Sequence, residues 1–213
     1  MKKIKKLFAH KIFKIFMWAF LVLLGLYLAL VIYRMFYFFN LDKTNTQVEK
    51  IHNEKITMDD VMGIDLPPDP GVEADKTIEG IDVNNNGIRD DVEIAIFNKY
   101  PDSPKTRGAL LQYALASQMQ INQPFMNTIL ATELAREEDR AITCLADTLV
   151  PRKNSESFRE YSDWEKINSY EIFIKDIQLN TDNRKKERYL FNLQVRSYSD
   201  LRIEKCDIDY SKL

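Results

Sequence analysis

An uncharged run of nineteen residues, from Ile15 to Tyr33, constrains the fold of this 213-residue chain more than any other feature. As an α-helix, the run covers about 28 Å, which is close to the ~30 Å hydrocarbon core of a bilayer. Trp18 and Tyr33 stand near its ends, where interfacial aromatic residues are expected. The run lacks the polar stripe that a soluble amphipathic helix shows. We therefore expect one transmembrane helix over residues 15–36, and a buried core helix is the weaker alternative.

The charges on either side of the run predict its orientation. One arginine, Arg34, follows it, whereas six lysines precede it: Lys2, Lys3, Lys5, Lys6, Lys11 and Lys14. Positive charge collects on the cytoplasmic side, so we expect residues 1–14 to be a cytoplasmic tail and everything after about Asn40 to lie outside the plasma (inner) membrane. The alternative is a cleaved signal peptide. Its apolar core is usually about 7–15 residues and is followed by small residues, whereas here the aromatic MFYFF segment follows, so we favour an uncleaved signal anchor.

Charge also divides the chain. No acidic residue lies before residue 40, and the remainder carries 23 basic against 32 acidic residues, a net charge of −9. An acidic outer part argues against nucleic acid as a partner and suits cation binding. Its length of about 170 residues is enough for one small domain with its own core.

Residues 82–93, with the sequence DVNNNGIRDDVE, have the spacing of a complete twelve-position calcium loop. Ca²⁺ takes six to eight oxygen ligands, and a short loop can supply them from alternate positions. Gly87 stands at position 6, where the chain must turn sharply. The candidate metal ligands, at positions 1, 3, 5, 7, 9 and 12, are Asp82, Asn84, Asn86, the carbonyl of Ile88, Asp90 and Glu93.

This loop resembles EF-hand calcium loops, and most closely the extracellular bacterial and thrombospondin type 3 style. The resemblance covers these twelve residues only and implies Ca²⁺ as the cofactor. Arg89 departs from it, because position 8 usually carries the aliphatic residue that pairs two hands. With a single copy, no entering helix and three carboxylates, the loop is expected to be a structural clip with a Kd of roughly 10⁻⁴–10⁻³ M and not a sensor. An Asx-rich turn without metal is the alternative.

Two cysteines, Cys144 and Cys206, both fall in the part that is expected outside the membrane. In an oxidising compartment an even count predicts one disulfide, which would tie the carboxy-terminal tail to a central helix. Two unrelated buried thiols are the alternative. Zinc is not expected, since no histidine lies near either cysteine.

The remaining pattern predicts a mainly α fold with at most a minor strand. Residues 37–80 contain Pro67, Pro68 and Pro70 and are expected to form a tether, with one turn of helix near residues 57–62. Residues 81–213 should form the helical domain, with the calcium loop at its start. Helices are expected over residues 90–100, 103–122, 124–149 and 182–198, while residues 157–180 fit either a strand or a helix.

No sequence motif specifies an enzyme. The two histidines, His10 and His52, lie in the cytoplasmic tail and the tether, and no nucleophile elbow, P-loop or dinucleotide fingerprint occurs. We expect a membrane-anchored, extracytoplasmic calcium-binding module whose partner is another envelope protein. The alternative is a calcium-stabilised envelope hydrolase that uses two carboxylates about 5–9.5 Å apart.

Overall fold

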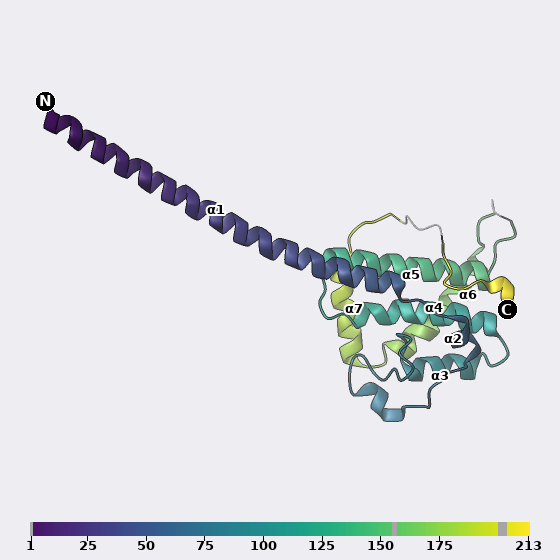
Figure 1. Ribbon diagram of the computed structural model, residues 1–213. Coiled ribbons are helices and arrows are strands. Elements are labelled where there is room, and N and C mark those ends of the chain that lie inside the picture. Colours follow the sequence, from purple (N-terminus) through teal and green to yellow (C-terminus); the bar gives the residue numbers. More distant parts are fainter. Residues whose placement is uncertain (1, 155–156, 200–203) are drawn as a thin grey trace. The chain divides into compact units, whose positions relative to one another are not determined.

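A computed structural model describes residues 2–154, 157–199 and 204–213. Helices account for 69% of the chain and the described residues include no strand, which confirms the mainly α fold. The chain divides into two compact units, residues 1–46 and residues 47–213, and Figure 1 shows each of them.

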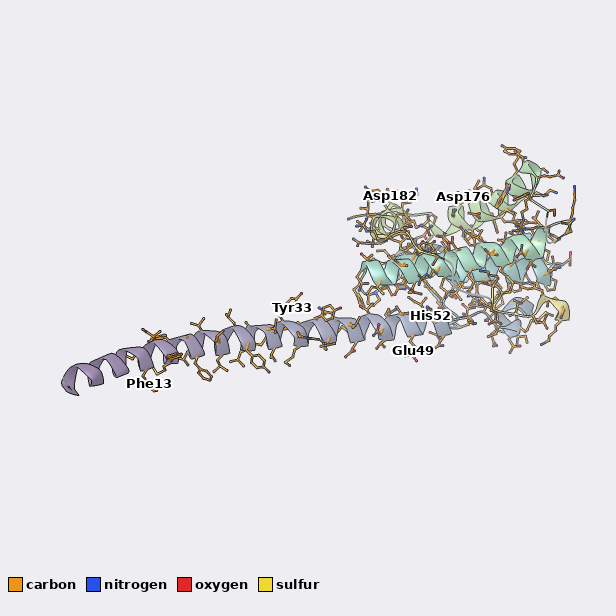
Figure 2. All side chains as sticks on the ribbon, turned by 90° about the horizontal axis from the view of Figure 1, so that it is seen from above. Phe13, Tyr33, Glu49, His52, Asp176 and Asp182 are labelled. Carbon is orange, nitrogen blue, oxygen red and sulfur yellow. A yellow bond between two sulfur atoms is a disulfide. The ribbon has the colours of Figure 1, made fainter. Side chains whose placement is uncertain are left out.

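The first unit is the major part of one long helix, α1 (Lys2–Asn53). Side chains are described from Phe13 onward, so five of the six lysines before the apolar run lie outside the described side chains. The part from Phe13 contains a window of mean hydropathy 2.7, none of which is buried inside the protein. Figure 2 shows side chains projecting around the helix between Phe13 and Tyr33. By length and composition, α1 can cross a membrane.

The second unit is a helical domain. It begins with the last turns of α1, which contribute the buried Ile51. The elements that follow are α2 (Met58–Met62), the 3₁₀ helix η1 (Gly71–Asp75), α3 (Asp90–Lys99), α4 (Pro104–Ile121), α5 (Thr128–Leu149), α6 (Tyr161–Gln178), α7 (Asp182–Gln194) and η2 (Tyr210–Lys212).

Helix α4 is the centre of this domain. Ser103 caps it by accepting a hydrogen bond from the Thr106 amide, and Pro104 occupies the first turn, so the helix begins where the sequence predicts. Every residue from Arg107 to Ile121 is buried, since α2, α3, α5, α6 and α7 all pack against this helix. Figure 1 shows α4 between α5 and α3.

Helix α5 carries half of the disulfide. It begins at Thr128, four residues after the predicted start at Pro124, because the Asn127 side chain accepts a hydrogen bond from the Leu130 amide and caps the helix there. Cys144 on α5 is bonded to Cys206, with Cα atoms 5.1 Å apart. The predicted link between the tail and a central helix is confirmed.

The next helix, α6, decides between the strand and the helix that the sequence left open for residues 157–180, and α7 follows it. Residues 161–178 form α6 and not a strand, and Ile167 and Ile174 are its buried residues at helical spacing. Helix α7 begins at Asp182, as predicted, and Thr181 caps it. It ends at Gln194 instead of near residue 198, because Val195 takes an extended conformation.

The segment expected to be a tether, residues 37–80, differs most from its prediction. Helix α1 continues to Asn53, because residues 37–53 contain no proline or glycine. Ile51, Ile56, Val61 and Ala74 are then buried in the domain. Widely spaced single apolar residues therefore anchor a segment that looks like a linker in the sequence.

Candidate metal centre

The candidate loop, residues 82–93, follows η1, includes the first turn of α3 and is closed at its base. The Asp90 amide donates a 2.8 Å hydrogen bond to the Ile81 carbonyl and so joins the two ends. Asn85 and Gly87 have positive φ values of 57° and 84°. A side chain at Gly87 would lie 2.5 Å from Glu54 Oε1 and 2.7 Å from Leu115 Cδ1, so both conformation and space require glycine at position 6.

The Asp82 and Asn86 side chains hold the turn from inside. Asp82 Oδ1 accepts from the Asn86 amide at 3.2 Å, and Asp82 Oδ2 accepts from the Gly87 amide at 3.0 Å. Asn86 Oδ1 accepts from the Ile88 amide at 2.9 Å. Both side chains therefore point into the loop, where the sequence predicted ligands.

Glu93 closes the loop from the first turns of α3. Its Oε1 accepts from Asn86 Nδ2 at 2.7 Å and its Oε2 accepts from Asn84 Nδ2 at 3.2 Å. Burial raises the pKa of Glu93 to about 7, and the carboxylates of Asp60 and Asp82 act in the same direction. The structure thus brings positions 3, 5 and 12 together.

Asp90, at position 9, is completely buried. Its Oδ1 accepts from the Val83 amide at 3.0 Å, which turns the carboxylate toward the loop. Its Oδ2 has no hydrogen-bond partner among the described residues. Burial raises the pKa of Asp90, and so do the nearby carboxylates of Asp82 and Asp91. A buried carboxylate oxygen without a partner is costly, and a cation would offset that cost.

Asp60 also lies among the polar side chains around the loop, although the sequence pattern did not indicate it. It lies on α2, in the segment expected to be a tether, and its Oδ1 accepts from Asn86 Nδ2 at 3.2 Å. Its Oδ2 accepts from the Thr57 amide at 2.6 Å and completes a capping box. Thr57 followed three residues later by Asp60 is the signal for that helix start, but sequence gives no sign that it meets the loop.

Position 8 fixes the loop to the domain. Arg89 is fully buried, and its guanidinium donates to the carbonyl of Gln178 at 3.0 Å and to that of Ile177 at 3.3 Å, both at the end of α6. Its Nε donates to Asp91 Oδ1 at 2.9 Å. Arg89 at position 8 thus contacts α6, whereas the aliphatic residue usual at this position pairs with a second calcium loop.

The arrangement does not contain a dense cluster of acidic ligands. Within the described part of the chain, no three His, Cys, Asp or Glu side chains meet in a group that could hold a metal ion. Around the loop the carboxylates are separated by amides, since Asn86 donates to both Asp60 and Glu93. Any metal here would depend on amide and carbonyl oxygens as well as on carboxylates.

A polar cavity of about 310 Å³ lies beside the loop. The end of α1 lines one side with Gln47 and Lys50, Glu54 lines it just after the helix ends, and the loop lines another side with Asp82. Burial raises the pKa of Glu54, although Lys50 partly offsets this, and Asp82 raises it further. The sequence did not predict this cavity, because residues 47–54 fall in the segment that was expected to be a tether.

Comparison with known proteins found no matching family model, no matching curated protein and no matching solved structure. The chemistry of the site is therefore inferred from its own residues.

Proposed function

We propose that residues 82–93 bind one Ca²⁺ ion as an EF-hand-like loop, and that the protein is a membrane-anchored, extracytoplasmic binding or scaffold module. The ion would be held by Asp82, Asn84, Asn86, the Ile88 carbonyl, Asp90 and Glu93. The observation that carries the proposal is the buried Asp90 carboxylate, which faces the loop and has an unpartnered Oδ2 among the described residues.

The electrostatics of the loop support the same proposal. Burial and mutual repulsion raise the pKa of Asp82, Asp90 and Glu93, so all three carboxylates are destabilised in their ionised form. A divalent cation removes this repulsion and favours ionisation. In the site as it stands, Asn84 and Asn86 donate N–H groups to Glu93, and rotation of these amides would present oxygen atoms instead.

The location proposed for the domain is outside the plasma membrane, with the amino terminus in the cytoplasm. The lysines before the apolar run and the disulfide between Cys144 and Cys206 support it, because disulfides persist in oxidising compartments. Calcium is abundant enough there for a weak site to remain filled.

The partner proposed is another protein of the cell envelope. Three aromatic side chains near the start of α6 are exposed to solvent, namely Phe158 (95%), Tyr161 (80%) and Trp164 (54%). Exposed aromatic residues are enriched at protein–protein interfaces, so this aromatic patch supports an interaction role. A photoreactive residue at position 161 in the membrane-anchored protein should crosslink to one partner, and substitution of Phe158 and Trp164 by alanine should abolish that crosslink.

Calorimetric titration of the detergent-solubilised, chelator-treated full chain tests the calcium proposal. We expect one Ca²⁺ per chain, a Kd on the order of 10⁻⁴–10⁻³ M and weaker binding of Mg²⁺, which dehydrates reluctantly. Loss of the heat signal in Glu93→Gln would locate the ion in the loop. Absence of binding by the wild-type chain would contradict the proposal.

A carboxylate-pair hydrolase is the second candidate, because Glu54 and Asp82 line one cavity. Against it, both Asp82 oxygens already accept backbone N–H groups of the loop, which ties this residue to the turn. Hydrolysis of an envelope glycan that is lost in Glu54→Gln, with calcium binding intact, would favour the hydrolase.

A further inference from the structure

The cavity beside the loop has the size and the lining of a small-molecule site. Its volume of about 310 Å³ lies at the lower end of the range of ligand pockets, roughly 300–1,000 Å³. Helix α4 contributes Gln118 and Met119, and the residues that follow it contribute Asn122 and Gln123. Met119 is the one apolar side chain among the described residues that line the cavity. Such a lining selects a small and strongly polar ligand, and not an apolar one.

Two opposite charges, Lys50 and Glu54, line this cavity without forming an ion pair. Lys50 lies in the last turn of α1 and Glu54 directly follows the helix, yet the described residues provide neither side chain with an ion pair or a hydrogen bond. A ligand that carries both a carboxylate and an ammonium group would pair with both side chains at once.

A buried amide supplies the second observation. Gln118 is 2% exposed, and its Nε2 donates to the Glu79 carbonyl at 3.1 Å, which fixes the side chain. Its Oε1 has no hydrogen-bond partner within the described residues. A buried acceptor that lacks a donor is unfavourable, so a ligand N–H or O–H would stabilise it.

Two further side-chain amides, those of Gln47 and Gln123, connect the sides of the cavity by hydrogen bonds. Gln47 Nε2 donates to Gln123 Oε1 at 2.8 Å, and Gln123 Nε2 donates to the Met119 carbonyl at 2.6 Å. Through Gln123, which follows α4, these bonds join the end of α1 to the last turn of α4. The site is therefore largely preformed, as ligand pockets usually are.

We propose that this cavity binds a free α-amino acid, with the ligand carboxylate at Lys50, its ammonium group at Glu54 and a further polar group at Gln118. Asp82 adds negative charge on the ammonium side. This role goes beyond calcium binding and does not require it.

Calorimetric titration of the detergent-solubilised full chain at saturating calcium tests the proposal. The twenty common L-amino acids are titrated one at a time, and we expect at least one to bind. For that ligand, the N-acetylated form lacks the ammonium group and the carboxamide form lacks the carboxylate. Each should bind on the order of tenfold more weakly or not at all. Glucose serves as an uncharged polar probe and should not bind.

Two variants test whether Lys50 and Glu54 bind the amino acid. Lys50→Met and Glu54→Gln should each weaken amino-acid binding on the order of tenfold. The matched control is Glu49→Gln, an exposed carboxylate next to Lys50 on α1 that does not line the cavity, and it should bind like wild type (Figure 2).

Calcium titration of the same proteins separates the two proposals. Unchanged calcium binding in Lys50→Met shows that the variant is folded, so loss of the amino acid there supports the inference. Failure of every amino acid to bind a wild-type chain that still binds calcium overturns the inference and leaves the proposed function standing. Equal binding of the N-acetylated or carboxamide forms, or glucose binding that Lys50→Met leaves intact, also overturns it.

Discussion

At the scale of single residues, Glu93 is the side chain on which the calcium proposal depends most. It is buried on α3 and accepts hydrogen bonds from two amides of the loop, so its carboxylate lies where a bidentate ligand is needed.

Glu93→Gln should lower the unfolding temperature in calcium but not in chelator. With calcium present, the glutamine lacks the negative charge that would bind the ion, so the site is weakened. Without metal, the same change removes a carboxylate whose ionised form is unfavourable in its buried site. Thermal unfolding by circular dichroism checks this, with Glu79→Gln, an exposed residue outside the loop, as the control. An equal loss in calcium and in chelator would mean that Glu93 has a packing role alone.

The same residue predicts a pH dependence. The pKa of Glu93 rises from 4.5 to about 7 on folding, so in chelator the folded protein binds the additional proton and its stability should fall as pH rises through that window. Calcium requires the ionised carboxylate, so the stabilisation by calcium should be larger near pH 8 than near pH 5. Unfolding measured at both pH values, with and without calcium, checks the sign. A calcium effect that is the same at both would contradict it.

Sequence spacing located the loop, its glycine and its closing glutamate, because these follow from local geometry. It did not identify Asp60 or Glu54, which reach the loop from an earlier segment through tertiary packing. Nor did it indicate that Arg89 and Arg184 are fully buried. Arg184 donates to the carbonyls of Thr77 and Ile78, so it binds backbone that periodicity cannot place.

At the scale of elements, the caps were predictable and the tether was not. The helices predicted from residues 103 and 182 and the turn of helix predicted near residues 57–62 all form. Ser103, Thr181 and Thr57 cap them, and capping needs only neighbouring residues. The buried positions between residues 51 and 74 depend on a surface formed by later helices. Residues 161–178 gave mixed periodicity because only Ile167, Ile174 and Gln178 are buried on α6.

The disulfide between α5 and the tail should be a large contributor to stability. Removing it with Cys144→Ala and Cys206→Ala frees a loop of 62 residues in the unfolded chain, which costs about 4 kcal/mol in the chain-entropy model. Urea unfolding of the double variant and of the wild type in reductant should show the same lowered midpoint. A midpoint equal to that of the oxidised wild type would contradict a stabilising bridge.

At the scale of the whole molecule, topology determines the environment of the domain. We predict that an alkaline phosphatase fused after Leu213 is active, because this reporter folds only outside the cytoplasm, and that a fusion after Lys14 is inactive. The opposite pattern would place the domain in the cytoplasm and remove the basis for both a stable disulfide and a calcium site of low affinity.

The central claim is that calcium binds the folded loop and stabilises the domain. Thermal unfolding of the full chain across a calcium titration tests it most directly. A ligand that binds only the folded state at ten times its Kd contributes about 1.4 kcal/mol, so the melting temperature should rise with calcium and saturate in the millimolar range. A melting temperature that stays constant from chelator to about 10 mM calcium, above the roughly 10⁻⁴–10⁻³ M Kd of such sites, would contradict the claim.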